Sequence, residues 1–110
     1  LSDTIGAATP EEITHIFESF QSQLPQCPLG AHLHATPHDA LPKLKAAWES
    51  GCRRIDTAMG GWGGCPMAKS DLTGNLSSEV MKLWIEDKVS GYDWEAFQKA
   101  SDMTPRIFMP

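Results

Sequence analysis

A cysteine preceded by a run of glycines is the feature of the sequence best suited to chemistry. Cys65 follows the segment Gly60-Gly61-Trp62-Gly63-Gly64 and is followed by Pro66. Glycine weakens both helices and strands, and it occurs where the backbone turns sharply, moves or approaches a ligand closely. We therefore predict a loop that displays a thiol. Its hinge is expected at four glycines: Gly60, Gly61, Gly63 and Gly64.

Two interpretations of the Cys65 thiol remain open from the residues alone. A free cysteine is most often a small, buried apolar side chain. The glycines and the proline beside Cys65 are instead typical of a loop. An exposed thiol close to a bound cation can act as acid, base or nucleophile.

His32 and His34 are a second candidate group, separated by one residue in the segment 29–34, which is predicted to be a strand. Because side chains alternate along a strand, both imidazoles project to the same face, close enough to bind one cation. Neutral imidazole is a common metal ligand. The alternative is two polar side chains at a strand end that face solvent, since the pattern alone has low specificity.

Asn75 and Glu79 complete the set of candidates. Asn75 follows Gly74 just before a predicted helix, so it suits a turn or a helix N-cap. Its amide oxygen is also a hard ligand for a divalent cation. Glu79 lies one helical turn later, where it can hydrogen-bond back toward the site or complement the helix dipole.

The elements that must position these groups begin with a well-marked helix. Thr9-Pro10-Glu11-Glu12 combines a capping threonine, a proline in the first turn and a glutamate that completes a capping box. Apolar residues then follow at helical spacing: Ile13, Ile16, Phe17, Phe20 and Leu24. The segment 25–28, which has a proline at each end, stops this helix.

Strands and helices are expected to alternate along the rest of the chain. Residues 1–6 resemble the end of a strand, and further strands are predicted over 29–34 and 53–59. A helix marked by Leu41, Leu44, Ala47 and Trp48 ends at Gly51, a third contains Val80, Leu83 and Trp84, and a short fourth contains Trp94, Phe97 and Ala100. This order predicts an α/β fold with a parallel sheet.

The chain is expected to form one partial domain over residues 1–110, with its C-terminal helices starting at about residue 76. In parallel sheets the functional groups lie at the C-terminal ends of the strands. Asp3, the two histidines and the glycine loop all follow predicted strands. Their shared location supports one common site.

Composition limits the partners. The net charge of −5 argues against nucleic acid or an anionic membrane. No apolar run approaches the roughly 20 residues of a membrane span. The three irregularly spaced cysteines do not suggest a disulfide framework, which favours a reducing, cytoplasmic location. The chain lacks an initiator methionine, so we expect it to be a piece of a longer protein.

Several motifs together resemble a known enzyme family. They are Asp3-Thr4-Ile5-Gly6, Ala31-His32-Leu33-His34, Asp56, Gly63-Gly64-Cys65-Pro66-x-Ala68 and Gly74-Asn75-x-x-x-Glu79. In this order, and up to about Lys99, they resemble the C-terminal part of hydroxymethylglutaryl-CoA lyase. The histidine pair and the Gly-Asn are shared by the wider superfamily of metal-dependent TIM-barrel lyases and condensing enzymes. The Gly-Gly-Cys-Pro-x-Ala loop is the lyase signature.

The resemblance implies a (β/α)8 barrel that cleaves 3-hydroxy-3-methylglutaryl-CoA, an acyl-CoA substrate, into acetyl-CoA and acetoacetate. His32, His34 and Asn75 match ligands of a divalent metal, Mg²⁺ or Mn²⁺. His32 also matches a proton donor to the enolate product. Cys65 matches the catalytic cysteine of a mobile loop, and Asp3 and Glu79 match acidic residues that shape the site. In a eukaryote the family implies the mitochondrial matrix.

The chain also departs from the family pattern. Ala35 replaces an acidic residue, Met67 an aromatic one and Val80 a second acidic residue, and the stretch from Cys65 to Asn75 is one residue longer. The family's first barrel strand supplies an Arg-Asp pair that no residue here matches. We therefore expect the chain alone to be inactive without the N-terminal half of the barrel, with its open sheet edges covered by self-association. A related acyl-CoA aldolase or condensing enzyme, or a non-catalytic metal- or ligand-binding module, remains the alternative.

Overall fold

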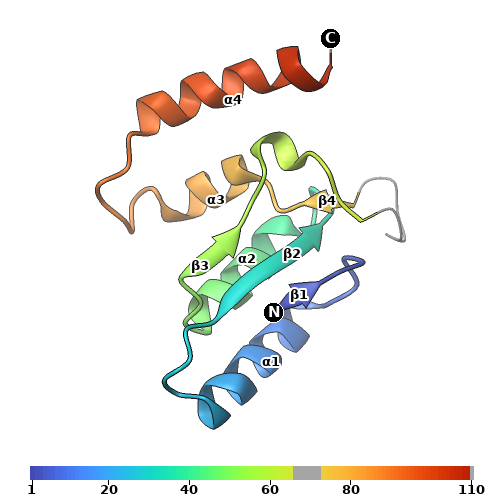
Figure 1. Cartoon of the computed structure of the whole chain (residues 1–110), viewed down its shortest axis with the longest axis vertical. Helices are drawn as coiled ribbons and strands as arrows, with labels where there is room; N and C mark the ends of the chain where they lie inside the picture. Colours follow the sequence, from blue (N-terminus) through green and yellow to red (C-terminus); the bar gives the residue numbers. More distant parts are fainter. Residues whose placement is uncertain (66–72, 110) are drawn as a thin grey trace.

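Three parallel strands form the centre of the structure, a computed structural model that describes residues 1–65 and 73–109. β1 (Ser2–Asp3), β2 (Gly30–Ala35) and β3 (Arg54–Asp56) lie in this spatial order, with β2 in the middle (Figure 1). The register places Ser2 beside His32 and His32 beside Asp56. A short fourth strand, β4 (Gly74–Asn75), pairs antiparallel with the end of β2. The predicted parallel sheet is therefore correct for β1–β3.

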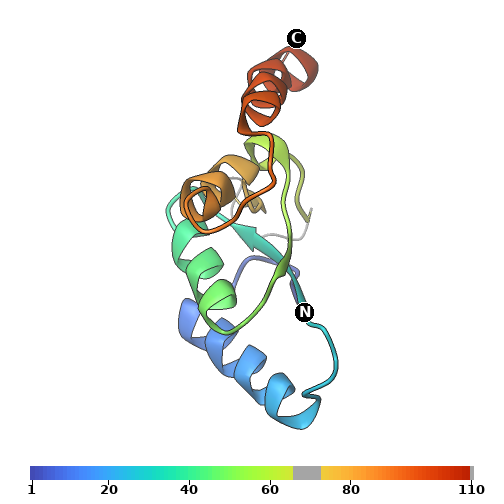
Figure 2. The same cartoon turned by 90° about the vertical axis from the view of Figure 1, so that its left-hand side faces the viewer.

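Two helices cover one face of these strands. α1 (Pro10–Gln23) and α2 (Ala40–Glu49) lie on the same side of the sheet, and none of the described helices covers the other side of β1–β3 (Figure 2). The predicted capping box at the start of α1 is present, with Thr9 and Glu12 each accepting a hydrogen bond from the other's backbone N–H. None of the described helices combines the length and apolar character that a membrane span needs.

The C-terminal part adds three helical elements. A 3₁₀ turn, η1 (Met59–Gly61), leads into the glycine loop, and α3 (Ser78–Ile85) and α4 (Trp94–Phe108) follow β4. α4 lies at the end of the molecule opposite α1 (Figure 1).

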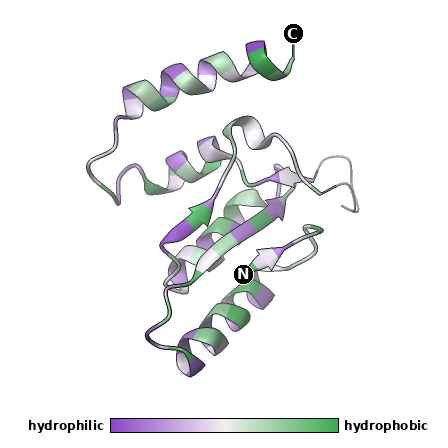
Figure 3. Ribbon diagram, viewed as in Figure 1, coloured by the Kyte–Doolittle hydropathy of each residue, from purple (hydrophilic) through white to green (hydrophobic). Residues whose placement is uncertain are grey.

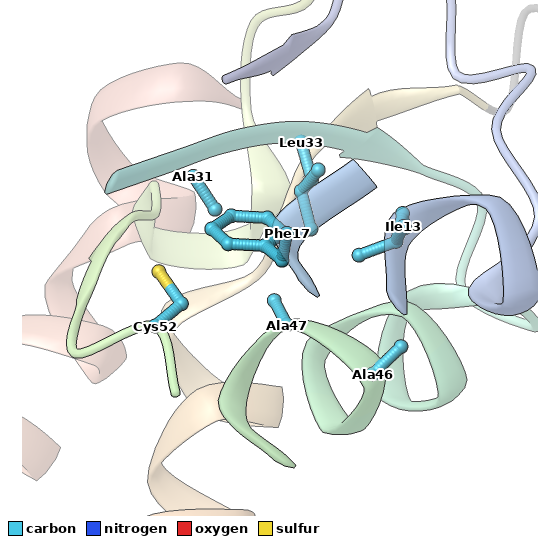
Figure 4. Packing of buried hydrophobic residues seen from close by; sticks show 7 residues of the cluster. All are labelled: Ile13, Phe17, Ala31, Leu33, Ala46, Ala47 and Cys52. Atoms are coloured by element: carbon cyan, nitrogen blue, oxygen red, sulfur yellow. The ribbon is translucent and has the colours of Figure 1, made fainter. Parts of the chain in front are cut away.

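The main core lies between β2 and the covering helices. The Phe17 ring of α1 is 1% exposed and lies between Ala31 and Leu33 of β2 and Ala47 of α2 (Figure 4). Cys52 closes the cluster, and burial raises the pKa of its thiol, so this cysteine is a structural residue. Removing the Phe17 ring would lower the free energy of unfolding by about 3–5 kcal/mol, which is a large part of the total stability of a small domain.

The alternation of β2 separates the core from the candidate site. Hydrophilic and hydrophobic residues alternate along the strand (Figure 3). Ala31 and Leu33 lie on the face of β2 that packs against the helices, whereas His32 and His34 lie on its opposite face. Burying the apolar set against α1 and α2 therefore fixes which face carries the histidines.

Some predicted elements need correction. The third strand covers Arg54–Asp56 only, because the chain after Asp56 turns toward η1. The fourth helix is not short but has 15 residues. Leu83 does not face the core, since it is 72% exposed.

A buried lysine connects the first two strands to α2. The Lys43 ammonium lies 3.0 Å from Asp3 Oδ2 and 3.0 Å from each of two carbonyl oxygens, those of Gly6 and His34. The Lys43 side chain is only 2% exposed. The Asp3 carboxylate also accepts hydrogen bonds from the backbone N–H groups of Ala7 and Ala8. A buried charge with this many partners is stable only while the whole set is present.

Replacing Lys43 with methionine is expected to destabilise the protein by about 3 kcal/mol or more, because Asp3 would be left as a buried charge without its counter-ion. Urea unfolding of the intact protein measures this change. Lys99→Met is the matched control, since the exposed Lys99–Glu95 pair should contribute less than about 1 kcal/mol. Equal effects of the two substitutions would contradict the role of Lys43.

Candidate active site

The two histidines lie close together at the end of β2. Their ring centroids are 5.1 Å apart and their planes meet at 79°. His34 is buried, whereas the His32 side chain is 47% exposed. The same-face arrangement predicted from the strand period is therefore present.

The second nitrogen of each imidazole ring is held by an acceptor. His34 Nδ1 lies 2.9 Å from the Asp3 carbonyl oxygen, and His32 Nδ1 lies 3.3 Å from Asp56 Oδ2. A carbonyl or a carboxylate can only accept, so Nδ1 carries the proton in both rings. In the neutral form of each ring, this arrangement leaves the lone pair on Nε2. This is the tautomer that a metal-binding histidine has when its other nitrogen is hydrogen-bonded.

Asn75 is brought to the histidines by β4, where it pairs directly with His34. Its Nδ2 group donates a hydrogen bond to the Trp62 carbonyl at 2.8 Å, which identifies the other amide atom as the oxygen acceptor. A Cβ on Gly63, where φ is +83°, would lie 2.9 Å from Asn75 Nδ2. Only glycine therefore permits this approach.

The predicted hinge glycines of the loop all have positive φ: Gly60, Gly61, Gly63 and Gly64. The loop runs along β4, since the Asn75 N–H donates to the Gly63 carbonyl and the Gly61 carbonyl approaches Gly74. Cys65 is half-buried at the end of this described segment. The rest of the signature, Pro66 to Ala68, lies outside the described residues.

A cleft of about 260 Å³ lies between the end of β2, the glycine loop and the start of α3. It is lined by residues that include Thr36, Pro37, Gly61, Asn75 and Val80. The cleft is at the C-terminal ends of the strands, and Asn75 is the one candidate ligand among the described residues that line it, since neither His32 nor His34 does.

The two acidic candidates lie beside the site, but their carboxylates bind other groups of the protein. Asp3 holds Lys43, and its backbone carbonyl orients His34. Glu79 accepts hydrogen bonds from the Gly60 N–H at 2.8 Å and from the Ser77 and Ser101 hydroxyl groups. Burial raises the pKa of Glu79, but these hydrogen bonds lower it more, and the net pKa is below its ordinary value.

Asp56 and Lys43 are parts of the site to which reasoning from the sequence gave no role. Asp56 could have been found from strand pairing, because parallel register with β2 sets it beside His32. Lys43 was detectable as a lysine within the apolar spacing of α2, between Ala40 and Leu44. Burial of such a residue requires an anionic partner.

The donor set fits a divalent cation. Among residues 1–65 and 73–109, no three His, Cys, Asp or Glu side chains are grouped to form a site by themselves. A third donor would have to come from the Asn75 amide, which strand pairing places next to His34. A mixed set of imidazole and oxygen donors suits Mn²⁺ or Mg²⁺.

Comparison with known proteins identifies the family. The family model described as HMGL-like matches residues 1–104. The chain belongs to this family. Over 104 residues it is 37% identical to the (R)-citramalyl-CoA lyase of Chloroflexus aurantiacus, covering 93% of the chain and 32% of that relative. It is 39% identical over 79 residues to the hydroxymethylglutaryl-CoA lyase of Pseudomonas mevalonii, covering 72% of the chain and 26% of that enzyme.

Solved structures of the HMGL-like family confirm the fold. The hydroxymethylglutaryl-CoA lyase of Pseudomonas aeruginosa matches all of the chain with a TM-score of 0.84 at 30% identity, over 37% of its own length. The HMG-CoA lyase of Acinetobacter baumannii, solved with coenzyme A and 3-methylmalate, matches 96% of the chain with a TM-score of 0.80 at 32% identity, over 35% of its own length. This HMGL-like chain is thus an α/β portion of a TIM barrel that spans about a third of its relatives.

Glu79→Gln is expected to destabilise the HMGL-like domain by about 1–3 kcal/mol at neutral pH, because an amide cannot accept all the hydrogen bonds that the carboxylate accepts. The folded pKa is depressed, so this stabilisation is present above the ordinary value of 4.5 and is lost as pH falls through the lower folded pKa. Urea unfolding of both proteins across this range should show their difference shrinking on acidification. If the difference in unfolding free energy between the two proteins stayed constant with pH, the charge of Glu79 would not be its cause.

Proposed function

We propose that this chain carries part of the active site of a carbon–carbon lyase that cleaves 3-hydroxy-3-methylglutaryl-CoA into acetyl-CoA and acetoacetate. The observation that carries the proposal is the pair His32 and His34, each with its Nδ1 held by an oxygen acceptor, beside Asn75 and the Cys65 loop. The HMG-CoA lyases among the relatives support the reaction class.

Residues His32, His34 and Asn75 would hold a divalent metal, Mg²⁺ or Mn²⁺, through two imidazole nitrogens and one amide oxygen. When bound, the metal supplies polarisation of the substrate hydroxyl oxygen. The chain keeps this donor set in place through Asp3 and Asp56, each of which holds the Nδ1–H of one ring. Such outer partners commonly affect metal affinity by about 10- to 100-fold.

Proton transfer is assigned to Cys65. The tertiary hydroxyl must lose its proton as the carbon–carbon bond breaks, and the acetyl-CoA enolate that forms must gain one. His32 has Nδ1 engaged by Asp56 and Nε2 assigned to the metal, so its predicted roles as ligand and as proton donor compete for the same ring. Cys65 lies on a loop beside the donor set. Its thiolate can accept the hydroxyl proton, and the thiol that forms can then donate this proton to the enolate carbon.

Asp3 and Glu79 would act as positioning residues in this reaction. Asp3 orients His34 through its backbone carbonyl, and Glu79 holds the first glycine of the loop through its carboxylate. The remaining strands of a barrel would cover the open face of the sheet and supply the rest of the site. We therefore propose that residues 1–110 alone do not turn over substrate.

A related lyase acting on a different 3-hydroxyacyl-CoA is the second candidate. The match to the citramalyl-CoA lyase extends over 93% of the chain, whereas the match to the Pseudomonas mevalonii enzyme covers 72%. Assays with 3-hydroxy-3-methylglutaryl-CoA and with citramalyl-CoA, each with Mn²⁺, separate the two. If the intact protein cleaved neither thioester, a non-catalytic metal-binding module would be the better account.

Cys65→Ala is expected to lower turnover by about 10²- to 10⁴-fold, because the proton-transfer group is lost, while Mn²⁺ affinity stays nearly unchanged. Acetyl-CoA release by the intact protein measures turnover, and titration calorimetry measures affinity. The control is Cys27→Ala, since Cys27 is an exposed thiol that follows α1. Loss of Mn²⁺ binding in a folded Cys65→Ala protein would show that the thiol role is misassigned.

His34→Ala is expected to weaken Mn²⁺ binding by at least about tenfold, because one of three protein donors is removed. The exposed His38 provides the control substitution, His38→Ala, which should leave the affinity unchanged. Full affinity in folded His34→Ala would exclude His34 as a ligand.

A further inference from the structure

α4 lies against the turn that begins the glycine loop. η1 contacts α4, which lies directly above this turn in Figure 1. Gly60 is enclosed there: a Cβ at this residue would lie 2.8 Å from the Trp62 ring and 3.6 Å from the Thr104 methyl group. Thr104 is the one buried residue among the described side chains of α4. η1 is therefore packed between α4 and the ring of Trp62, the residue that follows it.

Hydrogen bonds link α4 to the same turn through Glu79. The Ser101 hydroxyl donates to Glu79 Oε1 at 2.7 Å, and Glu79 Oε2 accepts the Gly60 N–H at 2.8 Å. One carboxylate of α3 thus bridges a side chain of α4 and the backbone of η1. Hydrogen bonds to an ionised carboxylate are stronger than those between neutral groups.

An aromatic stack makes the second contact. The rings of Trp62 and Phe108 have centroids 5.4 Å apart and an interplanar angle of 19°. Trp62 is three residues before Cys65, and its carbonyl holds the Asn75 side chain. Phe108 is the last residue of α4, so the stack fixes the end of this helix to the middle of the glycine loop.

We propose that α4 clamps the glycine loop and sets the position of the Cys65 thiol, with Ser101 and Phe108 as positioning residues. The four positive-φ glycines leave the loop little stiffness of its own, so contacts from outside the loop must select its conformation. Ser101 holds Gly60, the first glycine of the loop, through Glu79. Phe108 holds Trp62 of the same loop through the aromatic stack. The inference extends the proposed function by naming residues outside the reacting groups that control the thiol.

The test is the rate at which iodoacetamide alkylates Cys65 in the intact protein, followed by mass spectrometry of its peptide. Phe108→Ala and Ser101→Ala should each raise this rate by about two- to tenfold, the factor that corresponds to losing one aromatic stack or hydrogen bond. Phe108→Tyr and Ser101→Thr, which keep the ring and the hydroxyl, should restore the original rate. The exposed Cys27 in the same samples provides an internal reference.

Two control variants separate clamping from general loosening of α4. Tyr92→Ala removes the other stack of this region, with Trp94 at 5.2 Å, and Ile107→Ala removes an exposed apolar side chain next to Phe108. Both should leave the Cys65 rate unchanged. Equal rates in Phe108→Ala, Ser101→Ala and these controls would overturn the clamp. The assay needs no substrate, so it decides the clamp even if the protein cleaves no acyl-CoA.

Discussion

The ion pair between Lys43 and Asp3 is the interaction on which the rest of the structure depends. It forms a closed set with His34: Lys43 binds the Asp3 carboxylate and the His34 carbonyl, and the Asp3 carbonyl binds the His34 ring. Breaking any member leaves a buried polar group without its partner, which is far more costly than losing a surface contact. The end of β1, the end of β2 and the start of α2 are thereby held in one arrangement, and the imidazole of His34 with them.

The remaining features of the site follow from strand register around this fixed point. Parallel pairing with β3 places Asp56 beside His32, and antiparallel pairing with β4 places Asn75 beside His34. Neither neighbour is close in sequence, so the site exists only when the sheet is formed. The glycine loop then packs on β4, where Gly63 and Gly74 leave room for the backbone to approach. The core on the other face, centred on Phe17, keeps the histidines on the open side.

Features encoded by neighbouring residues were predictable, and those set by distant contacts were not. The capping box at Thr9 and the shared face of His32 and His34 depend on local spacing, and both are present. α4 was predicted too short from Trp94, Phe97 and Ala100, whereas the helix continues to Phe108 through Pro105, a residue that lacks an N–H and normally ends a helix. The pairing of β4 with β2 joins residues 39 to 41 positions apart, and Lys43 binds Asp3 and Gly6 at separations of 40 and 37, so no local pattern encodes these partners. The residue types of the candidate site were therefore identifiable, whereas the groups that orient them required the structure.

In the proposed site, His32 and His34 present unprotonated Nε2 atoms to a metal shared with Asn75. Long-range ¹⁵N–¹H spectra of the histidine rings, recorded before and during a Mn²⁺ titration of the intact protein, test it most directly. The account predicts the Nδ1–H tautomer for both rings and paramagnetic broadening of His32, His34 and the Asn75 amide before the exposed His15 and His38. An Nε2–H tautomer at His34, or equal broadening of all four histidines, would contradict it.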